Sequence, residues 1–337
     1  MAGEYPPQVV ADLRIMVSHE LHRWGMSRAS TISLLNLSEN ATFALCDPAS
    51  GRDLVLRVHR VGYSSLDEIR SELAWINALR RSEVIETAAP VPALDGELVQ
   101  TLDSPSGRPS RHAVAFERLP GKEPDAREAV QWFQRLGEVT ARMHLHARAW
   151  SLPAGFRRKR WDIDAMVGAQ AHWGPWRAAI GLEPQGAAVL ERTLEFIRRR
   201  LEQLGTDPTR FGLVHADLRL ANLLVDGARL RIIDFDDCGF SWYLYDFATA
   251  VSFIEHEAIV PGLLEAWCRG YRACAPLAAD EAAQIPTFVV LRRIMLTAWL
   301  ASHSEVPFAQ QFGAAYTAGT VELGRQLLAG RFLAVPA

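Results

Sequence analysis

The chain lacks the features of an extracellular, zinc-scaffolded or polyanion-binding protein. Its four cysteines, Cys46, Cys238, Cys268 and Cys274, form no CxxC pair and no zinc-type spacing. We therefore expect reduced thiols and a cytoplasmic location. Lys and Arg number 36 against 39 Asp and Glu, a formal net charge of −3. Because this balance provides no global basic field, nucleic acid is not an expected partner.

Long apolar runs and a secretory leader are also missing. No basic segment followed by an apolar run is visible near the N-terminus, so we expect no signal peptide. The longest apolar stretches, Ile285–Val290 and Ile294–Ala301, are interrupted by Pro286 and by Arg292 and Arg293. We therefore expect no bilayer-spanning segment and no membrane partner. What remains is a chain of 337 residues, 49% of them hydrophobic, which is long enough for two domains with a sizeable core.

The first 119 residues alternate short β-like runs with two helical patterns. A polar turn, Asp47 to Gly51, joins the second and third runs as in a hairpin. Ser65 is placed to cap the second helix. The pattern predicts an antiparallel sheet carrying a helix, with strands at Thr31–Leu37, Thr42–Cys46, Leu54–His59, Glu97–Leu102 and Ala113–Leu119 and helices at Val9–Trp24 and Ser65–Arg81.

Leu119-Pro120-Gly121 breaks this pattern, and we place the domain boundary there. Residues 120–337 are expected to be mainly helical, with one β-rich island from Leu213 to Asp234. The periodic segments that predict helices are Ala126–Ala147, Ala187–Leu204, Gly262–Cys274, Thr287–Ser302 and Gly313–Leu328. The expected fold class is α+β, with residues 1–119 and 120–337 as its two lobes.

The β-rich island carries the polar residues with the clearest chemical pattern. Two apolar runs flank Asp226-Gly227 and predict a hairpin, with Asp217 and Asn222 before its first strand and Asp234 after its second. An antiparallel pair brings those outer ends together, so the three side chains converge. Asn222 and Asp234 then offer oxygen ligands of the kind that Mg²⁺ prefers. Capping acids on a surface hairpin are the alternative, but the compound pattern of His-x-Asp-x4-Asn and Asp-Phe-Asp favours catalysis.

This order, with His-Ala-Asp at 215–217 and Asp-Phe-Asp at 234–236, resembles the aminoglycoside phosphotransferase and choline kinase superfamily, relatives of the protein kinases. The resemblance implies a two-lobed protein-kinase-like fold, ATP and Mg²⁺. It also implies that Asp217 accepts or orients the proton of the substrate hydroxyl and that Asn222 and Asp234 hold the metal. His215 would brace the loop by hydrogen bonds, and Asp246 would anchor the loop through its backbone amides.

The first lobe offers candidates for the phosphate-binding parts of such a fold. Arg57 stands on the third strand where protein kinases carry a lysine, and it can bind phosphate bidentately. Glu72 on the following helix is the expected partner of Arg57, with Glu68 one turn away as the rival. The loop between the first two strands contains no glycine, and Ser38 and Asn40 are its candidate donors to phosphate. By resemblance, adenine would contact the backbone of residues at 116–121, namely Glu117 and Leu119, with Phe116 lining the pocket.

The loop after Asp234 combines acids with aromatic residues, which could hold an amine by ion pairing and cation–π contact. Its candidate acceptor-binding residues are Asp236, Asp237 and Trp242, with core packing of Trp242 against the helices as the alternative. The sequence therefore predicts an ATP-dependent phosphotransferase acting on a hydroxyl of a small molecule, with an amino-alcohol or amino-sugar as the leading acceptor. Two alternatives stay open: a nucleotide-binding pseudokinase or regulator, and a Ser/Thr protein kinase. Only eleven residues separate Asp234 from Asp246, which favours a small acceptor over a peptide.

Overall fold

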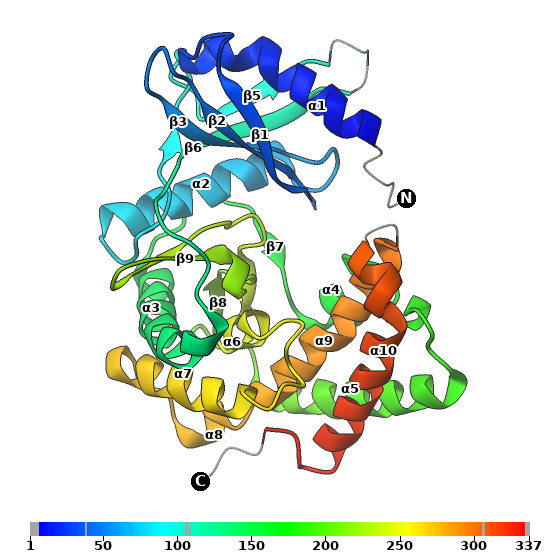
Figure 1. Cartoon of the computed structure of the whole chain (residues 1–337). Coiled ribbons are helices and arrows are strands. Elements are labelled where there is room, and N and C mark those ends of the chain that lie inside the picture. The colour runs from blue at the N-terminus through cyan, green and yellow to red at the C-terminus, as the bar shows by residue number, and fades with distance from the viewer. Residues whose placement is uncertain (1–6, 38, 105–106, 108, 305–306, 334–337) are drawn as a thin grey trace. The chain divides into compact units, whose positions relative to one another are not determined.

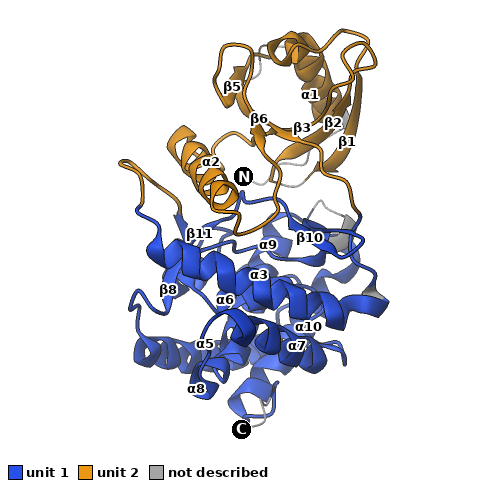
Figure 2. Cartoon of the chain, turned by 90° about the vertical axis from the view of Figure 1, so that its left-hand side faces the viewer, with its two compact units in different colours: residues 1–4, 122–151, 159–337 blue, residues 5–121, 152–158 orange. Residues whose placement is uncertain are grey.

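A computed structural model describes residues 7–37, 39–104, 107, 109–304 and 307–333 (Figure 1). The chain divides into two compact units, coloured separately in Figure 2. Unit 2 comprises residues 5–121 and 152–158, and unit 1 comprises residues 1–4, 122–151 and 159–337. The short segment 152–158 thus groups with the N-terminal unit although it follows the third helix along the chain.

Unit 2 is built on a six-stranded sheet in which every pairing is antiparallel. The strand order is β1-β2-β3-β6-β4, with β5 also pairing with β6. The two-residue strand β4 was not predicted from the sequence, because it is too short to show alternation. The strands are β1 (Thr31–Leu37), β2 (Ala41–Cys46), β3 (Asp53–Val58), β4 (Pro90–Val91), β5 (Val99–Leu102) and β6 (Arg111–Glu117).

The predicted hairpin between β2 and β3 is fixed by its first turn residue. The Asp47 carboxylate accepts hydrogen bonds from the Ser50 and Ser27 hydroxyls and from the Ala49 amide. These hydrogen bonds, that from Ser50 first, hold the pKa of Asp47 well below its usual range. Gly51 takes φ 69°, a left-handed conformation that glycine adopts without strain. The turn therefore follows from the local sequence.

Two helices complete unit 2, and each is positioned differently. Helix α1 (Pro7–Glu20) and the 3₁₀ turn after it supply Leu13, Met16 and Trp24 to a hydrophobic cluster with β2, β3 and β6. Helix α2 (Leu66–Arg81) begins with a capping box between Ser65 and Glu68. It buries Ile69, Glu72, Leu73, Ile76 and Leu79 along one side.

Unit 1 is mainly helical. Helices α3 and α7 cross at two glycines, Gly137 and Gly270, where a Cβ atom would overlap the backbone carbonyl of the facing helix. This close approach brings His144 of α3 and Tyr271 of α7 within hydrogen-bonding distance, at 3.0 Å. The helices are α3 (Ala129–Ala149), α4 (Ile163–Val167), α5 (Pro184–Leu204), α6 (Tyr245–Ala250), α7 (Val260–Cys274), α8 (Ala279–Ala282), α9 (Ile285–Ser302) and α10 (Pro307–Leu328).

Short strands in unit 1 frame the predicted island. Strand β11 (Gly239–Trp242) pairs antiparallel with β8 (Phe211–Val214) and parallel with β7 (Lys159–Arg160). Strands β9 (Leu223–Asp226) and β10 (Arg229–Ile232) form the expected hairpin, with Gly227 in its turn at φ 59°. The α+β, two-lobed fold class predicted from the sequence is confirmed.

One segment, Ala279–Ser302, is long and apolar enough to cross a membrane by length and composition, contrary to the sequence expectation. However, 83% of its most apolar window is buried inside the fold. It contains α9, which is surrounded by other elements of unit 1 and buries even Arg292 and Arg293. Helix α9 is therefore a core helix of unit 1.

Candidate active site

The hairpin ends bring the predicted polar residues together in unit 1. Leu223 pairs with Ile232 at the open end of β9 and β10, and the Ile233 amide donates to the Asn222 carbonyl at 3.0 Å. Asp234 follows Ile233 in the chain, so this backbone hydrogen bond brings Asp234 close to Asn222. On the other side, the Asn222 Nδ2 amide donates to the Asp217 carbonyl at 2.8 Å and to Asp217 Oδ2 at 2.7 Å.

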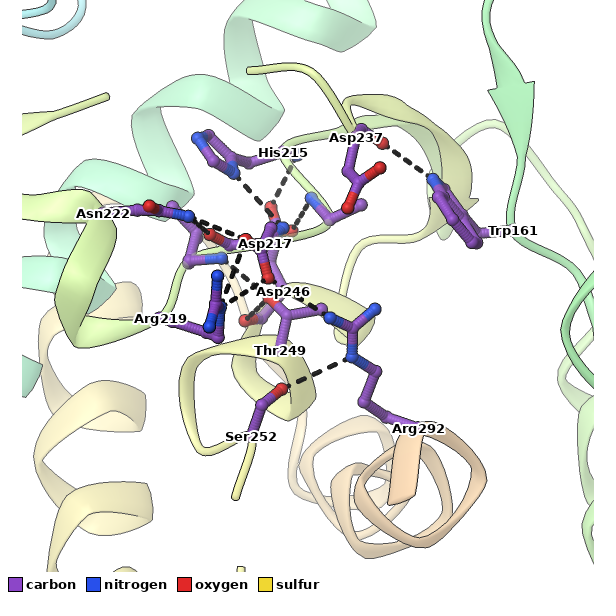
Figure 3. A network of polar contacts seen from close by, with 12 residues as sticks. Trp161, His215, Asp217, Arg219, Asn222, Asp237, Asp246, Thr249, Ser252 and Arg292 are labelled. Atoms are coloured by element: carbon purple, nitrogen blue, oxygen red, sulfur yellow. Dashed lines mark hydrogen bonds and ion pairs between the residues drawn. The ribbon is translucent and has the colours of Figure 1, made fainter. Parts of the chain in front are cut away.

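The backbone is strained at two points of the site, and the Asp246 carboxylate holds the loop that carries Asp217 by hydrogen bonds. Ala216 adopts φ 66° and Asp234 adopts φ 64°, conformations that non-glycine residues rarely take and that persist where surrounding contacts enforce them. The Asp246 carboxylate accepts hydrogen bonds from the His215 amide at 3.1 Å and the Ala216 amide at 2.7 Å (Figure 3). These are the backbone contacts that the family resemblance implied for Asp246.

Asp246 is itself fixed by a buried histidine. His144 on α3 contacts Asp246 Oδ2 through Nε2 at 3.0 Å and the Tyr271 hydroxyl through Nδ1 at 3.0 Å. Burial lowers the pKa of His144, although the neighbouring Asp246 acts in the opposite direction. A neutral imidazole thus joins α3 and α7 to Asp246, the residue that supports the loop carrying Asp217.

His215 is placed to brace the loop. Its Nδ1 accepts from the Asp217 amide at 3.2 Å, so the ring proton lies on Nε2, which donates to the Ile233 carbonyl at 3.2 Å. The ring also packs against Phe235 with centroids 4.4 Å apart. Burial lowers the pKa of His215. Both nitrogens are occupied by backbone groups, which suits a bracing role.

The Asp217 carboxylate is surrounded by donors (Figure 3). Besides Asn222, it accepts from Arg219 Nε at 3.1 Å and from Arg292 Nη2 at 3.2 Å. Burial raises the pKa of Asp217, but the charges of Arg219 and Arg292 outweigh burial and hold it below the ordinary value. The carboxylate is therefore ionised, with its two oxygens oriented by three side chains.

In unit 2, Arg57 on β3 and Glu72 on α2 form a buried ion pair, Nη2 to Oε1, of 2.5 Å. The Arg57 guanidinium also lies over the Phe116 ring, 5.2 Å from its centroid. Glu68, the rival partner, instead accepts from the amide and hydroxyl of Ser65 in the capping box. Glu72 is thus the acid that β3 and α2 bring to Arg57.

A model of the phosphotransferase enzyme family matches residues 31–277, more than half of the chain. The chain belongs to the phosphotransferase enzyme family. The resemblance seen in the sequence is confirmed, and so is the predicted enzyme class, a kinase with an alcohol group as acceptor.

Individual relatives of this phosphotransferase include small-molecule kinases. A solved microcompartment-associated aminopropanol kinase is 41% identical, with a TM-score of 0.88 over 96% of this chain and 99% of the other. An amicoumacin kinase of Bacillus subtilis is 24% identical over 242 residues, 71% of this chain and 67% of that protein. A solved amicoumacin kinase in complex with AMP-PNP and Ca²⁺ shares the fold, with a TM-score of 0.76 at 21% identity over 97% of this chain and 96% of the other.

The donor set of the phosphotransferase fits Mg²⁺. Both amide protons of Asn222 are directed to Asp217, so its Oδ1 oxygen is the atom that a cation would use. Asp234 is exposed at the surface of its unit. Within the described ranges, no group of three or more His, Cys, Asp or Glu side chains is placed to hold a metal. A cation here would therefore rely on waters and phosphates for most of its ligands, as Mg²⁺ commonly does.

The remaining nucleotide candidates lie in unit 2. Ser38 is outside the described residues. The Asn40 side chain accepts from the Arg60 amide at 3.1 Å and is buried, so it fixes the β1–β2 loop to the end of β3. The Glu117 amide donates to the Ala89 carbonyl at 2.9 Å, so this amide is already engaged and is not available to donate to an adenine ring nitrogen. Leu119 is partly exposed after β6.

The three acceptor candidates differ in environment. Trp242 is a core residue, because its indole is buried, donates to the Gly205 carbonyl at 2.8 Å and packs edge-on against Phe211. This placement argues against the sequence-based assignment of Trp242 to acceptor binding. Asp236 is buried, and Asp237 lies 3.4 Å from Lys159 Nζ.

Sequence reasoning missed several side chains of this network, among them Arg219, Arg292, His144 and Tyr271. Arg219 stands two residues from Asp217 and could have been noticed as a local charge partner. Arg292 is 75 residues from Asp217 in the chain, and His144 is 102 residues from Asp246. No local pattern connects those pairs, because only the packing of α3, α7 and α9 brings them together.

Proposed function

We propose that this phosphotransferase transfers the γ-phosphoryl group of Mg·ATP to the hydroxyl of a small amino alcohol. The observation that carries the proposal is the ionised Asp217 carboxylate, oriented by Asn222 beside the Asp234 end of the hairpin. The 41% identity to an aminopropanol kinase over nearly the whole chain supports the acceptor class. The AMP-PNP and Ca²⁺ complex of an amicoumacin kinase supports ATP with a divalent cation.

In this proposal the chain's own residues position the reactants. The acceptor hydroxyl donates its hydrogen bond to Asp217; its oxygen attacks the γ-phosphorus, and the bond to the β–γ bridging oxygen breaks. The hydroxyl proton passes to the Asp217 carboxylate as negative charge leaves with ADP. Asn222 and Asp234 would hold Mg²⁺, which supplies charge neutralisation on the phosphates. Arg57, held by Glu72, would contact phosphate oxygens.

The amine of the acceptor is assigned to the acidic loop after Asp234. Asp237 is a carboxylate at the edge of the site, within 3.4 Å of the Lys159 ammonium. An acceptor amine would replace or share that lysine contact, since both are cations of similar chemistry. Asp236, two residues after the metal-binding candidate, is a second acidic residue in the same loop.

The test is Mg²⁺-dependent ADP formation over a panel of acceptors with Asp217→Asn as the control. The panel contains aminopropanol isomers, ethanolamine, choline, homoserine, amino-sugars and a generic protein substrate. Stimulation by an amino alcohol that is lost in Asp217→Asn is expected. Stimulation by the protein alone would instead establish a protein kinase. Binding of Mg·ATP without turnover on any acceptor would favour a nucleotide-binding regulator.

A further inference from the structure

Helix α9 inserts an arginine into the centre of the catalytic network. All three nitrogens of Arg292 are engaged: Nη2 with Asp217 Oδ1 at 3.2 Å, Nη1 with the Tyr245 hydroxyl at 3.0 Å, and Nε with the Ser252 hydroxyl at 3.3 Å. Its side chain is 3% exposed. The guanidinium also lies over the Trp173 ring, 5.2 Å from the centroid. Burying a cation is costly unless it is paired, and these contacts provide the pairing. Together they also hold Arg292 in one orientation.

Arg219 contacts the same carboxylate but is built differently. Its Nε lies 3.1 Å from Asp217 Oδ1 and 3.2 Å from Oδ2, and its side chain is 36% exposed. Arg219 stands on the catalytic loop itself, so it moves with Asp217 and cannot fix that loop to the rest of the unit. Arg292 instead connects Asp217 to α6 and α9.

The next residue of α9 provides an internal comparison. Arg293 is 2% exposed and forms an ion pair of 2.5 Å with Glu255. It also donates to the Thr320 hydroxyl at 3.1 Å, so it joins α9 to α10. Arg292 and Arg293 are thus equally buried on one helix, but only Arg292 touches the catalytic carboxylate.

We propose that Arg292 is a positioning residue for phosphoryl transfer: it fixes the Oδ1 side of Asp217 while Asn222 fixes the Oδ2 side. Its planar fork reaches Asp217, Tyr245 and Ser252 at once, whereas a lysine ammonium could not span the three. The two restraints together set the direction in which the carboxylate meets the acceptor hydroxyl. The inference rests on the proposed function and adds a residue that nothing in the local motif identifies.

The test compares Arg292→Met and Arg292→Lys with Arg293→Lys in the full chain, using the acceptor that stimulates the wild type. We expect Arg292→Met to lower kcat about 100-fold, the effect of misplacing a catalytic group by about 1 Å. The KM for the acceptor and the Kd for Mg·ATP should change little, because Arg292 touches neither in the proposal. Compared with Arg292→Met, Arg292→Lys should recover part of the lost kcat, because lysine retains the positive charge but lacks the planar guanidinium group.

Arg293→Lys is the matched control, because it removes a buried fork from the same helix without touching Asp217. We expect it to lower the Tm while kcat stays near that of the wild type. Wild-type kcat in folded Arg292→Met would overturn the inference. A raised acceptor KM with unchanged kcat would overturn it too, and would make Arg292 a binding residue. An equal loss of kcat in Arg293→Lys would reduce the effect to general damage to α9.

A failure of the proposed function gives a different result. If no acceptor stimulates the wild type, the same variants are compared in ATP hydrolysis, where Asp217 would orient a water molecule. A fall in hydrolysis in Arg292→Met alone would support the positioning role even though the acceptor class is wrong. Equal hydrolysis in all variants, or none in the wild type, would overturn the positioning role as well.

Discussion

Two charged sites in this phosphotransferase are fixed by very different amounts of structure. In unit 2, Arg57 is held by Glu72, with β3 and α2 as the two supporting elements. In unit 1, Asp217 is held by Asn222, Arg219 and Arg292, and its loop is held by Asp246 from α6. Under the proposed function, Arg57 would bind phosphate and would need mainly charge at the right place. Asp217 would meet one hydroxyl and would also need a fixed direction, which agrees with its supports from α6 and α9.

The largest effect is expected at the metal-binding candidate of unit 1. Asp234→Ala removes a charged ligand from a site with few protein oxygens, so Mg²⁺-dependent ATP binding should be abolished. The measurement is calorimetric titration with ATP at fixed Mg²⁺ and with EDTA. Asp226→Ala, at the opposite, exposed end of the same hairpin, is the control and should bind normally. Normal Mg·ATP affinity in Asp234→Ala would remove Asp234 from the metal site.

Asp217→Asn should leave nucleotide binding intact and lower turnover. A positioned acid or base contributes about 10²–10⁴-fold to rate, and we expect a loss of kcat in that range. The shape of the side chain is retained, so Asn222 and the backbone contacts of the loop remain possible. Comparison of kcat with the Kd for Mg·ATP separates the role of the β-rich island in turnover from its role in nucleotide binding. Unchanged turnover would exclude Asp217 from the mechanism.

Glu72→Gln tests the simpler site of unit 2. Removing one partner of a buried ion pair leaves an uncompensated charge, which costs about 3–5 kcal/mol of stability. We expect a lower urea midpoint and a weaker affinity for ATP, because Arg57 loses its restraint. Glu68→Gln is the matched control on the same helix: it removes only part of a cap, and caps contribute about 1 kcal/mol. Equal losses of stability and of ATP affinity in the two variants would argue against a special role for Glu72.

The same contrast explains what could be predicted from the sequence. Alternation in 54–59 and periodicity in 65–81 predicted the strand that carries Arg57 and the helix that carries Glu72, because both elements are regular. The pairing of the two was implied by the family resemblance, with Glu68 as the rival, and the structure shows it to be with Glu72. The β9–β10 hairpin likewise brought Asn222 and Asp234 together, since a two-strand register needs only a turn. These features depend on local patterns with periods of about 2 and 3.6 residues.

The supports of Asp217 could not be predicted in that way. Arg292 was taken only as an interruption of an apolar run, because burial of an arginine is visible only once its partners are placed. His144 depends on the α3–α7 crossing at Gly137 and Gly270, which no local period encodes. For Trp242 the sequence left acceptor binding and core packing both open, because an aromatic residue beside acids looks the same in sequence in either place, and the structure shows it packed in the core.

The smallest expected effect is a dependence of stability on pH that belongs to unit 1. Burial lowers the pKa values of His144 and His215 below the ordinary 6.5, so both are neutral in the folded protein. As pH falls below about 6.5 the unfolded chain takes up protons that the folded protein does not, and stability decreases. Each such histidine contributes at most about 1.4 kcal/mol per pH unit between its folded and unfolded pKa values.

Urea midpoints should therefore be level from pH 8 to 7 and decline towards pH 5.5. His144→Gln should decline less steeply than the wild type, since glutamine does not titrate, whereas Glu68→Gln should keep the wild-type slope. A wild-type midpoint that rises on acidification, with the rise lost in His144→Gln, would mean that His144 gains its proton on folding, and the Asp246 contact would then be an ion pair instead of a neutral hydrogen bond.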